Sequence, residues 1–220
     1  MSSPATPGPI TDTSTSSPRT ISGNGRTSIQ RLLVTSVLMV VTLTVLTGIV
    51  FPLIMLGLGQ LFFNHQANGS LIKNSHGQVI GSQLIGQNFT KPQYFHPRLS
   101  AAGKGYDATS SGGTNLGPTN AQLLRNTIAQ ANLIRKQNNL PANYRLPADA
   151  VSASASGLDP DISQAYADLQ VPRIAKARGM SQAAVRVLVK KYTSGRDLGF
   201  LGEPGVNVLE LNLALDSAKK

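Results

Sequence analysis

The chain has 220 residues, of which 40% are hydrophobic and only 14% are charged, and it carries a formal net charge of +10. Soluble domains have about 25% charged residues, so this composition indicates that part of the chain lies outside water. The lack of cysteine excludes a disulfide scaffold, a thiolate metal site and a cysteine nucleophile. The positive charge leaves nucleic acid, an anionic membrane surface and an acidic protein as candidate partners.

Residues 1–30 are rich in Ser, Thr, Pro and Gly and contain almost no large apolar side chain. Such a composition cannot offset the entropy lost on ordering, so the sequence predicts a disordered tail. From Leu32 to Phe63 the chain has no ionisable side chain. Because about 20 apolar residues form a helix that spans a bilayer core, residues 31–62 are predicted to be a transmembrane helix region. The run exceeds the about 7–15 apolar residues of a cleaved signal peptide.

Positive charges are unequal on the two sides of this run. Arg19, Arg26 and Arg31 precede it, whereas Lys73 is the one basic residue that follows within a comparable distance. The positive-inside rule therefore predicts a cytoplasmic N-terminus and an extracytoplasmic C-terminal domain over residues 64–220.

Three residues within the run suggest contacts with other helices. Thr44 and Gly48 form a small-xxx-small pair, and Pro52 leaves the carbonyl of Gly48 without its helical donor. We expect these residues to take part in transmembrane packing. The alternative is that Gly and Pro are simply common in membrane helices.

The first part of the C-terminal region, residues 64–156, contains patterns typical of strands, turns and a helix. Val79-Ile80 and Leu84-Ile85, between glycines, predict one or two short strands, and residues 91–117 are rich in turn formers. A helix is predicted over 119–138, starting near Pro118, with Leu124, Ile128, Ala131 and Arg135 on one face. Alternation predicts a half-buried strand over 151–156.

Capping signals dominate the rest of the chain. Asp159-Pro160 predicts the start of a short helix through Leu169, and Val171-Pro172 predicts a second helix that stops at Gly179. Ser181 is expected to cap a third helix. Residues 206–215 fit both a strand and a helix, and Asn207 as a cap favours the helix. The predicted fold class is α+β, with a single N-terminal transmembrane helix followed by one extracytoplasmic α+β domain.

Motifs for chemistry are few. His65, His76 and His96 are scattered and lack neighbouring carboxylates, so no metal site is predicted. Asp159 and Asp161 flank a proline, where capping explains them better than acid–base catalysis. The basic residues of 173–191 lie on expected solvated faces without aromatic residues for base stacking, so nucleic acid is not an expected partner. The sequence predicts no catalytic residue.

Five ordered blocks together resemble one family, the C subunit of Kdp-type potassium-transporting ATPases (KdpC). The blocks are YFHPRLSA (94–101), SGGTNLGPTN (111–120), SASGLDPDIS (154–163), QVPRIAKARGM (170–180) and GEPGVNVLELNLALD (202–216). The resemblance covers residues 30–216. His96-Pro97 and Ala121 depart from the usual family pattern, and the tail is longer than expected.

The resemblance implies a non-catalytic accessory subunit of an ATP-driven, high-affinity potassium import complex in the cell inner membrane. Such a subunit would stabilise assembly and act as a catalytic chaperone that promotes ATP binding by the P-type ATPase subunit. Its implied partners are that subunit, a potassium-channel-like subunit and membrane lipid. No cofactor is expected on this chain itself. ATP is implied only through the complex, and Gln170 is the candidate nucleotide contact.

The same resemblance gives candidate interface or architectural residues. They are Asn115, Gly117, Pro118, Thr119, Asp159, Pro160, Pro172, Arg173, Arg178, Asn207, Glu210 and Asn212. The alternatives are a membrane-anchored extracytoplasmic hydrolase, which requires a convergent nucleophile, base and orienting group, and a module that binds polyanions in a salt-sensitive way.

Overall fold

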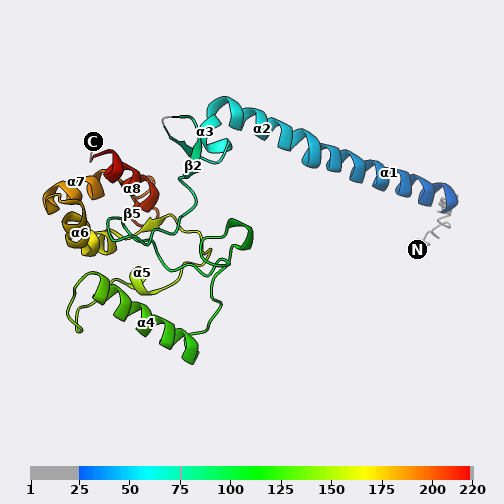
Figure 1. Ribbon diagram of the computed structural model, residues 1–220. Coiled ribbons are helices and arrows are strands. Elements are labelled where there is room, and N and C mark those ends of the chain that lie inside the picture. Colours follow the sequence, from blue (N-terminus) through cyan, green and yellow to red (C-terminus); the bar gives the residue numbers. More distant parts are fainter. Residues whose placement is uncertain (1–24, 75, 219–220) are drawn as a thin grey trace, which may run out of the picture. The chain divides into compact units, whose positions relative to one another are not determined.

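The computed structural model describes residues 25–74 and 76–218 (Figure 1). Residues 1–24, which make up most of the predicted disordered tail, lie outside the described residues. The chain divides into two compact units, one over residues 1–58 and the other over 59–220. We call the second unit the C-terminal domain.

The N-terminal unit consists of helix. α1 (Gly25–Val45), a π-helical turn η1 (Leu46–Val50) and α2 (Phe51–Phe62) follow one another. Residues 28–62 are long and apolar enough to cross a membrane, and their apolar side chains are exposed. The helix begins at Gly25 rather than at residue 31, because no proline lies between Pro18 and Pro52 to stop it.

A short helix α3 (Asn64–Ala67) leads into a hairpin of β1 (Leu71–Lys73) and β2 (Val79–Ser82). The two strands are antiparallel, with Ile72 opposite Gly81. The strand predicted at Val79-Ile80 is confirmed. The strand predicted at Leu84-Ile85 is wrong, because Ser82 turns the chain there by accepting the backbone N–H groups of both residues.

A second, three-stranded sheet is formed by β3 (Asp161–Ile162), β4 (Thr193–Ser194) and β5 (Gly205–Asn207), with β5 in the centre and both pairings antiparallel. The strand predicted over 151–156 is wrong. Residues Ala148–Val151 form a short helix, α5, which ends where Ser152 bonds back to the carbonyl of Ala148. Only an isolated bridge from Ala153 to Leu99 follows.

The helix predicted over 119–138 is α4 (Ala121–Gln137), capped by Asn120 rather than started at Pro118. Residues before it are irregular apart from the 3₁₀ turn η2 (Ala108–Ser110), as predicted. The face grouped in the sequence analysis is not the most buried face of α4. Leu124 and Ile128 are 62% and 51% exposed, whereas Ile134 is buried at 1%. Leu123 and Ile134 share the packed face, one position around the helix from the expected one.

The two helices predicted over 159–169 and 171–179 are one helix, α6 (Gln164–Arg178). Ser163 caps it instead of Asp159, because Asp149 accepts hydrogen bonds from the backbone and hydroxyl of Ser163 and fixes it at the helix start. Pro172 lies inside the helix rather than at the start of a second one. Buried Val171 and Ile174 on either side explain why tertiary packing overrides this helix breaker.

The other predicted helix caps and the helix-ending glycine are confirmed. Gly179 ends α6 in the left-handed region with φ of 67°, and Ser181 caps α7 (Gln182–Lys191). Asn207 caps α8 (Val208–Ser217), which settles the ambiguous last run as a helix. The domain is therefore a mixture of helices with two small antiparallel sheets.

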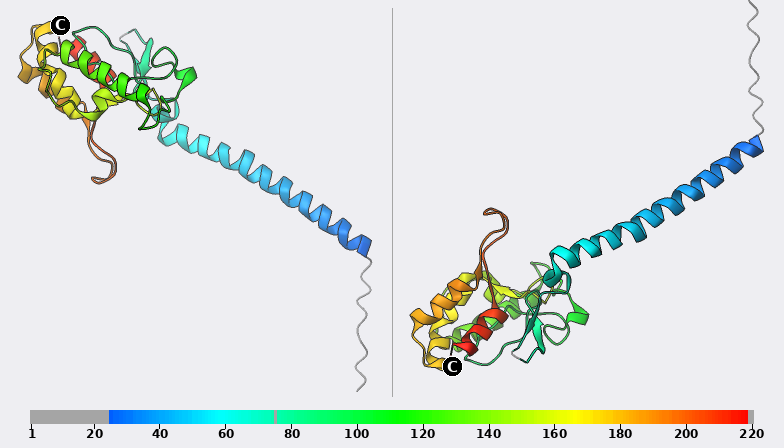
Figure 2. Two further views of the ribbon diagram at one scale, coloured as in Figure 1. Left: turned by 90° about the horizontal axis from the view of Figure 1, so that it is seen from below. Right: turned by 90° about the horizontal axis from the view of Figure 1, so that it is seen from above.

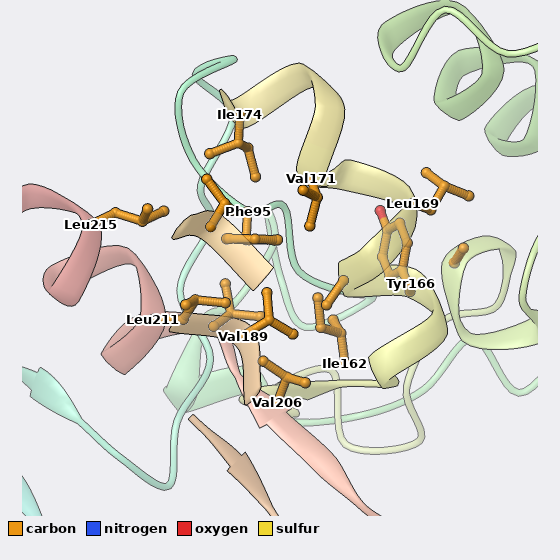
Figure 3. Packing of buried hydrophobic residues seen from close by; sticks show 14 of the residues in the cluster. Phe95, Ile162, Tyr166, Leu169, Val171, Ile174, Val189, Val206, Leu211 and Leu215 are labelled. Atoms are coloured by element: carbon orange, nitrogen blue, oxygen red, sulfur yellow. The ribbon is translucent and has the colours of Figure 1, made fainter. Parts of the chain in front are cut away.

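The hydrophobic core lies between α6, α7, α8 and the second sheet (Figure 3). Ile174, Val189, Val206 and Leu211 are each at most 1% exposed. Phe95 is fully buried although it belongs to no helix or strand. Irregular chain therefore passes through the core, and its backbone polar groups need partners there.

Candidate functional site

We call residues 91–98 the central segment, because it is the irregular chain that carries Phe95 into the core. It includes most of the first sequence block that resembles the KdpC family. A buried backbone without strand partners would leave donors and acceptors unpaired, at a cost of about 1–3 kcal/mol for each group. Polar side chains from α6 and α8 supply those partners.

Two buried amide side chains hold the centre of this segment. Asn212 of α8 accepts the N–H of Phe95 at 2.8 Å and donates to its carbonyl at 3.0 Å. Gln170 of α6 does the same for His96, at 2.8 and 3.1 Å. Asn212 is 1% and Gln170 is 0% exposed. Each carboxamide offers one acceptor and a donor, so it replaces the peptide group of a missing neighbouring strand.

Arg173 fixes the first part of the central segment. Its Nη1 donates to the carbonyls of Pro92 and Tyr94, its Nη2 donates to Gln170 Oε1 at 2.6 Å, and its Nε donates to Asn138 Oδ1 at 3.0 Å. Burial lowers the pKa of Arg173 to about 10, so the guanidinium remains charged at neutral pH. Its planar donors thus join the central segment to α6 and to the end of α4.

Arg178 is the second arginine anchor. It donates to the carbonyls of Gln93 at 2.7 Å and Leu215 at 3.0 Å, and it pairs with Asp216 at 2.7 Å. Its guanidinium carbon lies 5.0 Å from the ring centroid of Tyr94. The side chain is only 4% exposed. One residue therefore connects the end of α6, the end of α8 and the central segment.

Asp159 anchors the other end of the segment. Its Oδ2 pairs with Arg98 Nη1 at 2.7 Å, and its Oδ1 accepts the N–H of Asp161 at 3.0 Å. The adjacent carbonyl of Pro160 accepts the N–H of Val208 at 3.0 Å. Burial, and next the charge of Asp159, raise the pKa of Asp161. Asp159 is thus an ion-pair partner and turn former, and not a helix cap.

Asn207 and Glu210 belong to a polar cluster separate from the central segment. Asn207 donates to the carbonyl of Gln83 at 2.9 Å, and Gln83 in turn donates to Glu210 Oε1. These three residues, with Asp161 and Lys191, line a cavity of about 420 Å³. The cluster fixes the start of α8 to the chain that follows the hairpin.

Four of the candidate interface residues contact neither the central segment nor the cluster of Gln83, Asn207 and Glu210. Asn115, Gly117, Pro118 and Thr119 are exposed on the loop that precedes α4. Asn115 adopts a positive φ of 52°, a conformation that Asn tolerates better than most residues. Pro172 is exposed as well. These residues are available at the surface, whereas Gln170, Arg178 and Asn212 are buried inside the domain.

The membrane-helix candidates lie around a local change of helix type. Gly48 lies within the π-helical turn, where the N–H of Phe51 reaches the carbonyl of Leu46, five residues back. Pro52 has no N–H and would crowd the carbonyl four residues earlier, which a widened turn relieves. Thr44 and Gly48 are exposed, and a Cβ added to Gly48 meets nothing within 4 Å. The described residues of this chain leave that surface uncovered.

The predicted nucleotide contact, Gln170, is a poor ligand in this geometry. Its amide is fully buried, and both of its polar atoms are bonded within the protein. Direct contact with ATP would require those bonds to break.

Titratable groups are dispersed. Among residues 25–74 and 76–218, no three His, Asp or Glu side chains gather as metal ligands. The imidazole of His96 bonds to the carbonyl of Lys91, and that of His65 bonds to Gln83. Burial, and next the charge of Arg173, lower the pKa of His96. These histidines serve local structure in the described part of the chain.

Sequence reasoning missed several supports. Arg98, Gln83, Asn138 and Asp149 each bond to a predicted residue or to the cap of α6. Arg98 lies within the first family block, which could have identified it. The others carry no local signal, because their partners lie 14 to 127 positions away.

The fold and these clusters define a class of protein, a small mixed α and β domain that follows one N-terminal helix long and apolar enough to span a membrane. A family model described as "KdpC: K+-transporting ATPase, c chain" matches residues 33–217. The chain is 55% identical over 187 residues to the potassium-transporting ATPase KdpC subunit of Mycobacterium tuberculosis strain H37Rv, covering 85% of this chain and 98% of that protein.

Two further relatives carry the same name. The protein of Koribacter versatilis is 52% identical over 85% of this chain and 95% of its own length. That of Rhodospirillum rubrum is 55% identical over 79% of this chain and 89% of its own length. The chain therefore belongs to the KdpC family. It is a subunit of the potassium-transporting ATPase complex and not the catalytic subunit, as the sequence resemblance implied.

Proposed function

We propose that the chain stabilises the assembled potassium import complex and acts as a catalytic chaperone for its P-type ATPase subunit. One observation carries this proposal. The buried residues of the family blocks, such as Gln170, Arg178 and Asn212, are used to hold the domain together, while apolar surface on the membrane helix remains uncovered by the described residues. The chain thus offers binding surfaces instead of a reaction centre.

We infer an inner-membrane topology with the N-terminus in the cytoplasm and the C-terminal domain outside it. The support is the charge difference between Arg19, Arg26 and Arg31 before the helix and Lys73 after it. On this topology, the domain lies on the side from which potassium enters. The inferred partners are the channel-like subunit for the domain and neighbouring membrane helices for α1 and α2.

The effect on ATP binding is then transmitted indirectly. ATP is cytoplasmic, and the burial of Gln170 also argues against direct contact with nucleotide. The surface of Thr44, Gly48 and Pro52 is the proposed contact with partner helices, because small residues allow close approach of backbones. The π-helical turn at this position shapes that contact.

The decisive experiment compares the purified ATPase complex with and without this chain. We expect the complex without it to lose potassium-stimulated ATP hydrolysis, or to need a higher ATP concentration for half-maximal rate. A fully active, stable complex without the chain would refute the proposal. Gly48→Ile is expected to weaken assembly, and Gly57→Ile is its matched control, since a Cβ at either glycine meets nothing within 4 Å in this chain.

Gln170 provides a separate test of the indirect route. Photoactivatable ATP should label the P-type subunit and leave this chain unlabelled in the intact complex. Labelling of this chain that disappears in Gln170→Leu, with the domain still folded, would favour direct contact instead.

A further inference from the structure

The connection between β4 and β5, residues 195–204, projects from the body of the C-terminal domain. Both views in Figure 2 show it as an orange-brown loop extending away from the helices of the domain. Leu198, Phe200 and Leu201 at its tip are 82%, 70% and 49% exposed. Scattered exposed apolar residues are ordinary on protein surfaces, but three within four positions at the end of a projecting loop form a single apolar tip.

Hydrogen bonds and an ion pair within the loop restrict its conformation. Asp197 and Leu201 exchange both backbone hydrogen bonds at 2.9 Å, and Arg196 pairs with Glu203 at 2.8 Å across the base. Gly199 and Gly202 supply positive φ angles of 83° and 76°. A loop restricted by such bonds loses less conformational entropy on binding than a free loop, which favours contact through its apolar side chains.

The backbone at the tip is strained. Leu198 has a φ of 51°, which is unfavourable for a bulky side chain and is usually left to Gly or Asn. Its side chain is also 82% exposed, so no packing within the described residues compensates for the strain. Backbone strain of this kind is often kept where it serves binding.

Charge distinguishes between a protein and a lipid bilayer as the occupant. The loop has one basic residue, Arg196, and two acidic residues, Asp197 and Glu203, which give a net charge of −1. It contains neither Trp nor Tyr. Loops and helices that bind bilayers typically combine apolar residues with Lys and Arg, and Trp and Tyr prefer the interface. The composition therefore favours an apolar pocket in a protein, with a basic group near Asp197.

We propose that the β4–β5 loop docks its Leu198 and Phe200 side chains into an apolar pocket of another subunit of the potassium-transporting ATPase. The proposal rests on the function proposed above, in which this chain stabilises the assembled complex. It adds the surface through which the C-terminal domain would be held.

The lack of native cysteine allows a direct test. Leu201→Cys places the only thiol of this chain at the tip and keeps the proposed anchors Leu198 and Phe200, and Val187→Cys places the thiol on α7 at a position that is 67% exposed. A soluble maleimide is applied to each full-length variant alone in detergent, alone in phosphatidylcholine–phosphatidylglycerol vesicles, and in the purified complex. We expect L201C labelling to slow by about tenfold or more in the complex only, because the surroundings of docked anchor residues are desolvated, and V187C labelling to remain fast.

Three results would overturn the proposal. Equal labelling of L201C in the complex and in detergent would show that no subunit covers the tip. Protection in vesicles without the other subunits would assign the tip to lipid. Protection in detergent alone, with a cross-linked dimer, would assign it to a second copy. None of these results bears on the deletion experiment, so this inference can fail while the proposed function stands.

Leu198→Gly separates docking from folding. Glycine adopts the positive φ without steric strain, so the thermal midpoint of the domain is expected not to fall. Retention of the chain on a tagged channel-like subunit, the partner proposed above for this domain, is expected to weaken about 30-fold, as for loss of an interface anchor. Unchanged retention with an unchanged midpoint would contradict docking through this side chain.

Discussion

From Ile29 to Phe62, the large apolar side chains of the N-terminal helix are all exposed, whereas in the C-terminal domain Phe95, Ile174 and Leu211 are completely buried. The domain thus has a closed apolar core of its own, and it also buries the polar groups that pair the central segment. The helix has no such cover within the described chain. Its apolar surface therefore requires an apolar environment, as expected for the candidate membrane span of a membrane-associated subunit.

The largest expected difference between the two regions is in the cost of removing a leucine. Leu211→Ala should lower the unfolding free energy of the C-terminal domain by about 2–5 kcal/mol, because it leaves a cavity in a closed core. Leu38→Ala, at a position 64% exposed on α1, should leave that free energy unchanged. Urea unfolding of the full chain in detergent, followed by near-UV circular dichroism, measures both. Equal effects would show that the helix contributes to the domain core.

The next effect concerns the amide supports of the central segment. Asn212→Ala should cost about 1–3 kcal/mol, because the buried N–H and carbonyl of Phe95 lose their partner. Amide hydrogen exchange should accelerate most at Phe95. Asn126→Ala removes an exposed amide on α4 and is the matched control, expected to have little effect. If the exchange rate of the Phe95 amide were unchanged in N212A, Asn212 would not be the residue that protects this backbone group.

A smaller effect is expected at a helix terminus. Gly179→Ala should destabilise the domain by about 1 kcal/mol, because its φ of 67° places a Cβ against the backbone. Gly117→Ala, in the exposed loop before α4 where a Cβ meets nothing, should be neutral. Thermal midpoints of the two variants give the comparison. If Gly117→Ala lowered the thermal midpoint as much as Gly179→Ala does, the loop before α4 would have to be constrained by contacts that the structure does not show at Gly117.

The smallest effect is a pH dependence. Burial and Arg173 lower the pKa of His96 in the folded domain, so the unfolded chain binds a proton more readily. The contribution of neutral His96 is present above its unfolded pKa of about 6.5 and is lost as the pH falls through the lowered folded pKa. The thermal midpoint should therefore decline on acidification below that value, and His96→Gln should reduce the decline. The raised pKa of Asp161 acts in the opposite sense, since its protonation favours the fold at lower pH.

Local signals in the sequence determined much of this molecule. The long uncharged run specified the helix, and Gly179, Ser181 and Asn207 marked the ends of three helices, because caps and helix-ending glycines act through neighbouring backbone atoms. The ordered family blocks were sufficient to identify the KdpC family. They also included Gln170, Arg173, Arg178 and Asn212, without revealing what these residues do.

The tertiary structure decided what depends on distant partners. Asn212 contacts Phe95 across 117 positions, and Arg178 contacts Gln93 across 85, so no local pattern indicates that these side chains hold an internal segment. Packing on both sides of Pro172 kept α6 continuous, and the position of α4 selected Ile134 rather than Leu124 as its buried residue. Local chemistry fixes where elements begin and end, whereas burial is shared among residues far apart in sequence and is set only when the chain is folded.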